Sequence, residues 1–85
     1  MWAKLVKDNH LLRDTVVAYA DGDTRTHKVF RALEEVCLEM DLAKPIWLDA
    51  NVKAFQRHGK TRFRAESFVE DISFDYLEIE ILEED

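Results

Sequence analysis

This chain of 85 residues has only one cysteine, one proline and two glycines. The single cysteine, Cys37, excludes an intrachain disulfide and suits a reducing compartment. No apolar run is long enough to span a membrane, and the first residues lack the basic and apolar regions of a signal peptide. We therefore expect a cytoplasmic protein that does not enter a membrane.

Motifs for metal or phosphate chemistry are also missing. The sequence has no glycine-rich phosphate loop and no His-Glu-x-x-His pattern. His10, His27 and His58 are isolated, and none has another ligand at a recognised metal-site spacing. Asp21-Gly22-Asp23 has the start of a calcium loop without its later ligands, so we interpret it as a turn. No metal and no cofactor are expected.

Nucleophiles are poorly placed for catalysis. Cys37 lies on the apolar face of a predicted helix, where a thiol behaves as a small hydrophobic group with a raised pKa. Ser67 and Ser73 have no base near them in the sequence, and there is no Gly-x-Ser-x-Gly motif. We therefore predict that the protein is not an enzyme.

The composition is that of a folded chain with one core. Hydrophobic residues make up 47% of the chain and aromatic residues 11%, which disordered chains do not reach. A chain of this length has no room for two cores. We expect a single domain over residues 1–85.

Apolar periodicity predicts the elements of this domain. Residues 2–7 and 11–20 read as a β-hairpin with a turn at Asp8-Asn9-His10. Residues 26–41 read as a helix, because Val29, Leu33, Val36, Cys37 and Met40 recur on one face, which Phe30 widens. Pro45 ends that region.

A second, shorter helix is predicted over residues 50–58. Asp49 is a suitable N-cap, Gly59 a suitable terminator, and Val52 and Phe55 would face the core. Within residues 60–71, Phe63 and Phe68 are expected to anchor the core, joined by an irregular segment or a single helical turn.

Residues 75–82 alternate apolar and polar side chains and read as the final strand, with Leu77, Ile79 and Ile81 facing the main helix. The predicted fold is an α+β domain of two layers. It has a three-stranded, mainly antiparallel sheet with two helices on one face, in the order β-β-α-α-(turn)-β.

Several segments carry a resemblance. They are Pro45-Ile46-Trp47-Leu48, Asn51, Phe55, Lys60-Thr61-Arg62-Phe63 and Phe74-Asp75-Tyr76-Leu77-Glu78-Ile79. With these segments the chain resembles a group of short, uncharacterised proteins from Gram-positive anaerobic bacteria. The resemblance implies a bacterial source and assigns no activity, ligand or site residue.

Charge in this chain is sorted by position. Residues 53–64 contain five bases and no acid, and we call them the basic segment: Lys53, Arg57, Lys60, Arg62 and Arg64. Residues 66–85 contain nine acids and no base: Glu66, Glu70, Asp71, Asp75, Glu78, Glu80, Glu83, Glu84 and Asp85. Such neighbouring blocks are either an intramolecular match or a binding surface with two signs.

The basic segment is the candidate binding site. Lys60, Arg62 and Arg64 would share one face of an extended chain, and such a row suits phosphates or an acidic peptide. Phe63 would lie between two arginines and offer a stacking face. The alternative is that these cations only solvate the surface and pair with the acidic strand.

The acidic strand also has two interpretations. Glu78 and Glu80, continued by Glu83-Glu84-Asp85, could contact a basic protein or imitate a phosphate backbone. Equally, outward charges keep an edge strand from pairing with a neighbour.

These patterns predict a small, non-enzymatic interaction module that uses residues 53–64 to bind an anionic macromolecular surface. The expected partner is an acidic protein, because a net charge of −6 disfavours nucleic acid. The alternative is a homodimer in which the first or last strand pairs across a two-fold axis. In that arrangement, the basic segment of one chain would meet the acidic strand, residues 75–85, of the next.

Overall fold

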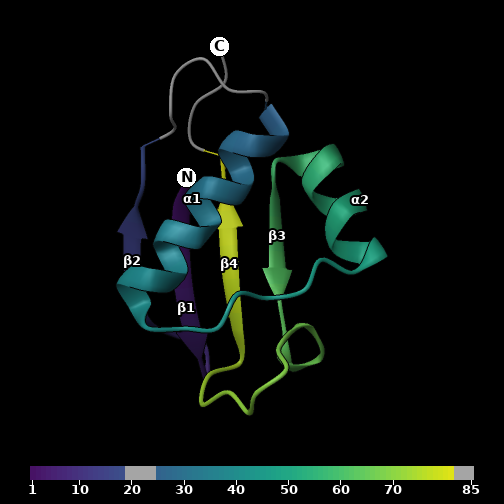
Figure 1. Cartoon of the computed structure of the whole chain (residues 1–85). Helices are drawn as coiled ribbons and strands as arrows, with labels where there is room; N and C mark the ends of the chain where they lie inside the picture. The colour runs from purple at the N-terminus through teal and green to yellow at the C-terminus, as the bar shows by residue number, and fades with distance from the viewer. Residues whose placement is uncertain (19–24, 82–85) are drawn as a thin grey trace.

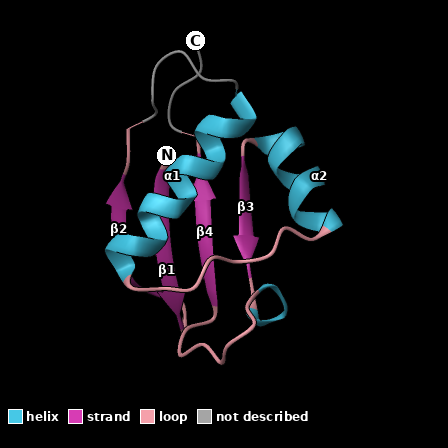
Figure 2. Ribbon diagram, viewed as in Figure 1, coloured by secondary structure: helices cyan, strands magenta, loops and turns pink. Residues whose placement is uncertain are grey.

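A computed structural model describes residues 1–18 and 25–81 of the chain. It is an α+β fold with these elements: β1 (Trp2–Lys7), β2 (His10–Val16), α1 (Arg25–Met40), α2 (Asp49–His58), β3 (Lys60–Phe63), a 3-10 turn η1 (Ala65–Ser67) and β4 (Tyr76–Glu80) (Figure 2). The α+β class was predicted correctly. The expected sheet of three strands and the expected order β-β-α-α-(turn)-β were wrong, because residues 60–63, which were expected to be irregular, form a fourth strand between α2 and η1.

The four strands form an antiparallel sheet in the order β2-β1-β4-β3. The C-terminal strand β4 is inserted between β1 and β3 (Figure 1). The first and last strands are therefore the two central strands, and each already has a neighbour on both sides. The expected dimer contact through the first or last strand is wrong, since the strands at the edges are β2 and β3.

A tight turn joins β1 to β2, as predicted. Asp8 and Asn9 adopt positive φ angles of 52° and 64°, which is the backbone of a two-residue hairpin turn that Asp and Asn tolerate well. Asp75 reinforces this turn, because its carboxylate accepts a hydrogen bond from the Asp8 backbone N–H at 2.8 Å. β2 ends at Val16, and the last two residues of the predicted strand, 19 and 20, lie outside the described residues.

Helix α1 lies across one face of the sheet (Figure 1). The five residues at the centre of its predicted apolar face are buried, and this core also contains Leu77 and Ile79 of β4, with Ile81 packed against it. Phe30, which was expected to widen that face, is 49% exposed. Leu38, on the opposite side of the helix, is 77% exposed. Asp41 has a φ of 56°, a left-handed angle that ends the helix close to the predicted position. The loop of residues 19–24 before α1 lies outside the described residues.

Trp47 joins the two helices to the sheet. Its ring makes edge-on contacts with Phe30 of α1, Phe55 of α2 and Phe63 of β3, at centroid distances of 6.1, 5.6 and 5.0 Å. Edge-to-face aromatic pairs at these distances are favourable. The segment between the helices therefore serves as a side wall of the core.

Helix α2 lies next to the edge strand β3 (Figure 1). Phe55 is buried as predicted, but Val52 is exposed and Asn51 is buried in its place. Asn51 and Phe55 are four residues apart and share a helix face. The expected Val52–Phe55 face was wrong because it assumed that only apolar side chains would point inward.

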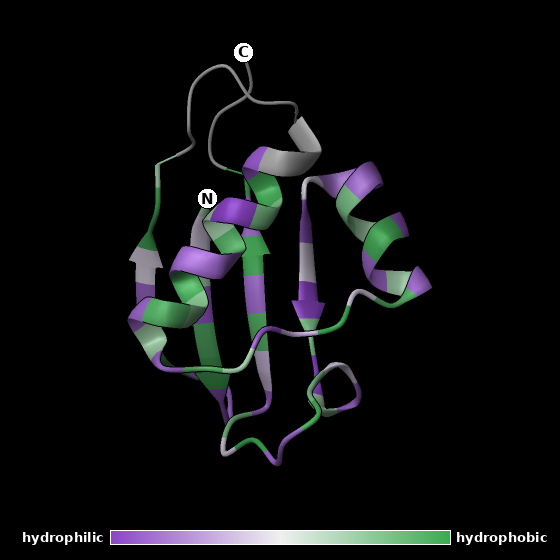
Figure 3. Cartoon of the chain, viewed as in Figure 1, coloured by the Kyte–Doolittle hydropathy of each residue, from purple (hydrophilic) through white to green (hydrophobic). Residues whose placement is uncertain are grey.

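The faces of the strands alternate in polarity. Hydrophobic and hydrophilic residues alternate along β4 (Figure 3). Leu77 and Ile79 belong to the core that also contains the buried face of α1, so Tyr76, Glu78 and Glu80 point to the other face of the sheet. No helix in residues 1–18 and 25–81 lies on that other face, which we call the open face.

Candidate functional site: the α2–β3 basic groove

The basic segment follows the folded chain through α2 and β3. Lys53 and Arg57 are four residues apart on the exposed side of α2, opposite the buried pair Asn51 and Phe55. Gly59 then has a φ of 68° and donates its N–H to the Phe55 carbonyl at 2.9 Å. This left-handed residue ends α2 and sends the chain directly into β3.

Strand β3 alternates inward and outward residues. Thr61 and Phe63 are buried, while Lys60, Arg62 and Arg64 are exposed. The predicted shared face of the three cations is therefore present. Phe63 is 0% exposed, because the strand period of two turns it into the core. Its predicted place as a core anchor, with Phe68, is confirmed, whereas its expected role as a stacking surface for a partner was wrong.

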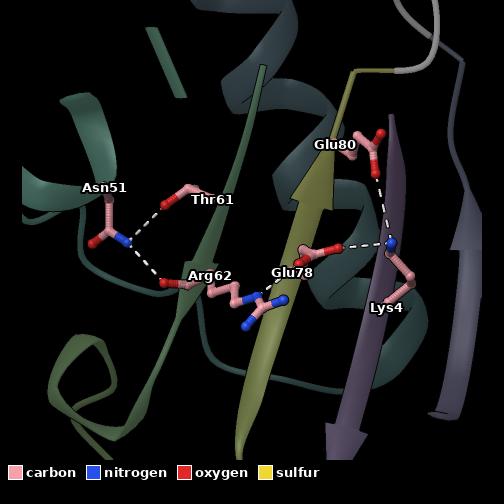
Figure 4. A network of polar contacts seen from close by, with 6 residues as sticks. All are labelled: Lys4, Asn51, Thr61, Arg62, Glu78 and Glu80. Carbon is pink, nitrogen blue, oxygen red and sulfur yellow. Dashed lines mark hydrogen bonds and ion pairs between the residues drawn. The ribbon is translucent and has the colours of Figure 1, made fainter. Parts of the chain in front are cut away.

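Asn51 fixes the position of α2 against β3. Its amide nitrogen donates to Thr61 Oγ1 at 3.0 Å and to the Arg62 carbonyl at 2.9 Å (Figure 4). Its amide oxygen accepts from the Leu48 backbone N–H at 3.0 Å and from Ser67 Oγ at 3.4 Å. One buried side chain thus joins the start of α2, the edge of β3 and η1.

Sequence reasoning gave Asn51 no role. The spacing of Asn51 four residues before Phe55 was the available signal, but a polar residue in a short helix is ordinarily expected to face solvent.

One cation of the basic segment pairs with the acidic strand. Arg62 Nε lies 2.8 Å from Glu78 Oε1, and Lys4 Nζ of β1 lies 2.7 Å from Glu78 Oε2 (Figure 4). Burial alone would raise the pKa of Glu78, but hydrogen bonds and positive charge from Lys4 and Arg62 outweigh it and lower that pKa. The hydrogen bond that Arg62 donates to Glu78 correspondingly raises the pKa of Arg62.

Tyr76 provides a second support for the arginines. The guanidinium groups of Arg62 and Arg64 lie 4.5 and 5.4 Å from the centre of its ring. Cations at this distance are attracted to the ring face. Both arginines are therefore positioned above β4 and are restrained without losing their charge.

The other cations have no acidic partner within the described residues. No ion pair joins Lys53, Arg57, Lys60 or Arg64 to a described carboxylate. We call these four residues the free cations. The sequence left open whether the basic segment pairs with the acidic strand or forms an open surface. Arg62 does the first, and the free cations, which face solvent, do the second.

A groove of about 380 Å³ runs between α2 and β3. Its lining combines the basic side chains with the small residues of α2: Leu48, Ala50, Asn51, Ala54, His58, Lys60, Thr61, Arg62, Arg64, Glu66 and Glu78. Lys60 and Arg64 belong to the free cations, and Lys53 and Arg57 extend the positive charge along α2. The arrangement can hold an extended anionic chain.

The acidic strand is closely tied to the basic one. β3 pairs with β4 so that Lys60 is opposite Glu80 and Arg62 is opposite Glu78. Glu80 is 3.5 Å from Lys4 of β1. The acids Glu83, Glu84 and Asp85 lie outside the described residues. Within the described strand, the carboxylates therefore serve to hold cations of the same sheet.

Two nucleophiles considered from the sequence, Cys37 and Ser67, are buried in the structure. Burial raises the pKa of the Cys37 thiol to about 11, against a smaller opposing effect of Lys44. Ser67 is buried and donates to Asn51. Within residues 1–18 and 25–81, no three potential ligands from His, Cys, Asp and Glu gather into a metal site, and no helix has the length and apolar character to cross a membrane.

Comparisons with known proteins assign no relative. No protein-family model, no curated protein and no solved structure matches the chain. The resemblance to short proteins of Gram-positive anaerobic bacteria stays a prediction.

Proposed function

We propose that this protein is a non-enzymatic interaction module that binds an acidic segment of another protein in the groove between α2 and β3. The free cations Lys53, Arg57, Lys60 and Arg64 would contact the carboxylates of the partner. Arg62 would act mainly as a support, because it is already bonded to Glu78.

The observation that carries this proposal is the absence of acidic partners for the free cations within the described residues. Lys4 and Lys44 do have acidic partners, Glu78 and Glu34. Lys7 and Lys28 also form no ion pair with a described carboxylate, so what distinguishes the free cations is their grouping on α2 and at β3. Lys60 and Arg64 line the groove, and Lys53 and Arg57 lie beside it on the exposed side of α2. Together these cations create a local positive potential that attracts an anionic ligand. Such steering remains effective within about 10 Å at 0.1 M salt.

A protein partner fits the groove better than nucleic acid. Glu66 and Glu78 lie in its lining and would repel a continuous run of phosphates. The ring of Phe63 is buried, so the segment lacks the exposed aromatic platform on which bases stack. An acidic peptide has separated charges and can avoid both carboxylates.

The absence of catalysis and the cytoplasmic location are parts of the same proposal. Cys37, the one strong nucleophile type in the chain, is buried with a raised pKa. A buried free thiol is compatible with a reducing compartment.

Fluorescence anisotropy with a labelled peptide rich in Glu and Asp tests the proposal on the full chain. We expect binding that weakens as salt rises. The double variant Arg57→Glu, Arg64→Glu should weaken it about tenfold or more, because two attractive charges become repulsive. The matched control Lys7→Glu, Lys28→Glu makes the same change in net charge at sites outside the groove and should weaken it much less.

Three results would oppose the proposal. Equal weakening by the two double variants would mean that only net charge matters. If the wild-type protein binds neither the acidic peptide nor a single-stranded oligonucleotide, the groove does not bind an anionic ligand. Tighter binding of the oligonucleotide than of the peptide at the same salt would assign the groove to nucleic acid.

A further inference from the structure

The open face carries a row of four charges that alternate in sign across the sheet. The register places Asp14 of β2 opposite Lys4 of β1, Lys4 opposite Glu78 of β4, and Glu78 opposite Arg62 of β3. Because paired residues of antiparallel strands point to the same face, the row reads negative, positive, negative, positive. This row is argued independently of the groove proposed above, although Arg62 and Glu78 belong to both.

The row is held rigidly. Glu78 is within 2.7 Å of Lys4 and 2.8 Å of Arg62, and Figure 4 shows these side chains reaching toward one another from three strands. Asp14 accepts a hydrogen bond from Trp2 Nε1 at 3.1 Å. The outer charges retain free surface, since the Arg62 side chain is 50% exposed. A partner would therefore meet a fixed pattern of charge.

An alternating row of even length matches its own reversed copy. Consider a two-fold axis that lies in the plane between two facing copies, runs parallel to the strands, and passes over the line between β1 and β4. A half turn about this axis reverses the order of the four charges. Asp14 then faces Arg62 of the second copy, and Lys4 faces Glu78 of the second copy. Every position in the row meets the opposite sign.

We propose that two copies of this chain associate face to face through their open faces, around a two-fold axis parallel to the strands. The other principal in-plane axis, perpendicular to the strands, would place Asp14 against Asp14 and is disfavoured by like-charge contact. Two sheets stacked with nearly parallel strands are a usual packing geometry.

Apolar side chains beside the charged row support the same arrangement. Val6 of β1 is opposite Leu11 on one side and Tyr76 on the other, and these three form the neighbouring row of the open face. The proposed axis brings Val6 against Tyr76 of the second copy. Val16, at the edge of the same face, is 64% exposed and would lose solvent contact.

A second copy fits this face better than nucleic acid does. Asp14, Glu78 and Glu80 would all point toward a phosphate backbone and repel it. Four strands about 4.8 Å apart make a small face, so the buried area is at the low end for specific interfaces. The expected dimer is weak and forms at micromolar concentration or above.

Exchange of the two outer charges tests the pairing. The variants Asp14→Arg and Arg62→Asp each create two like-charge contacts in their own homodimer. Mixed together, they restore Arg against Asp at both positions. Sedimentation of the full chain should therefore show self-association of the wild type, at least about tenfold weaker association of each variant, and recovery in the equimolar mixture.

A wild-type chain that stays monomeric up to sub-millimolar concentration would overturn the proposal. So would variants that associate as the wild type does, or two folded variants whose mixture fails to associate. If Arg62→Asp does not fold, dilution of the isotopically labelled wild type provides a second test. Its amide signals should then shift with concentration in β1 and β4, and shifts confined to α1 and α2 would refute the face-to-face dimer.

Discussion

Arg62 on β3 and Glu78 on β4 stand opposite each other in the sheet, with Nε and Oε1 2.8 Å apart. Among the described residues, this is the one ion pair between the basic segment and the acidic strand, and it adds to the backbone pairing of β3 with β4. Lys4 completes the cluster from β1 at 2.7 Å. Glu78 binds two cations, Lys4 and Arg62. The free cations form no ion pair with a described carboxylate, so they remain available to a partner.

Glu78→Gln should destabilise the protein at neutral pH by about 1–3 kcal/mol, since it removes the ionised partner of Lys4 and Arg62. The pKa of Glu78 is lowered in the folded state. Its stabilising contribution is therefore complete above the unfolded value of about 4.3 and is lost as the pH falls through the folded pKa.

Thermal melts of wild type and Glu78→Gln at stepwise lower pH check this. The difference in Tm should be largest near neutral pH and should shrink once the medium is more acidic than the unfolded pKa. Glu70→Gln, at an exposed site, is the control and should change little. A difference for Glu78→Gln that stays constant across this range would show that the ion pairs are not its cause.

Asn51→Ala should cost about 2–4 kcal/mol, because it removes four hydrogen bonds and leaves buried groups such as Thr61 Oγ1 without a partner. Chemical denaturation measures the loss. Gln56→Ala, on the exposed side of the same helix, should change the free energy of unfolding by less than about 0.5 kcal/mol. Similar values for the two variants would contradict the joining role of Asn51.

Leu33→Ala should cost about 2–4 kcal/mol through the cavity that it leaves in the core. Leu33 is buried on the face of α1 that packs against the sheet. Leu38→Ala makes the same chemical change at an exposed site of the same helix and should stay within about 0.5 kcal/mol of the wild type. A melt of Leu33→Ala close to that of Leu38→Ala would mean that this helix face is not buried.

Cys37 should react slowly with a thiol reagent in native buffer and rapidly in denaturant. Its side chain is buried, and that burial raises the pKa of the thiol to about 11, so little thiolate forms near neutral pH. The rate of labelling in the two conditions checks this. Rapid native labelling, or loss of peptide binding on alkylation without unfolding, would revive a functional role for this thiol.

The elements with strong apolar periodicity could be predicted from the sequence. The face of α1 and the alternation of Leu77 and Ile79 in β4 have one physical cause, burial on one side, and each pattern spans several residues. The turn at Asp8 and Asn9 followed from local backbone preferences. The boundaries shifted by a few residues, since ends depend on contacts made elsewhere in the fold.

The strand conformation of β3 and the burial of Asn51 could not be predicted from the sequence, because both depend on contacts with segments elsewhere in the chain. β3 has four residues, and its cations Lys60 and Arg62 hide the alternation that buries Thr61 and Phe63. β3 is stabilised by pairing with β4, which is distant in sequence. Asn51 is buried because its partners Thr61 and Ser67 arrive with later segments. Likewise, charge counting found the basic segment but could not assign Glu78 to Arg62.

The most direct test of the central claim is a chemical-shift titration of the labelled full chain with the acidic peptide. We expect shifts of the amide signals of α2 and β3, near Arg57, Lys60 and Arg64, that saturate with peptide and shrink as salt rises. The signals of β2, on the opposite edge of the sheet, should stay in place. Shifts centred on β2 or α1, or no saturable shifts at low salt, would contradict the proposal that the free cations form the binding site.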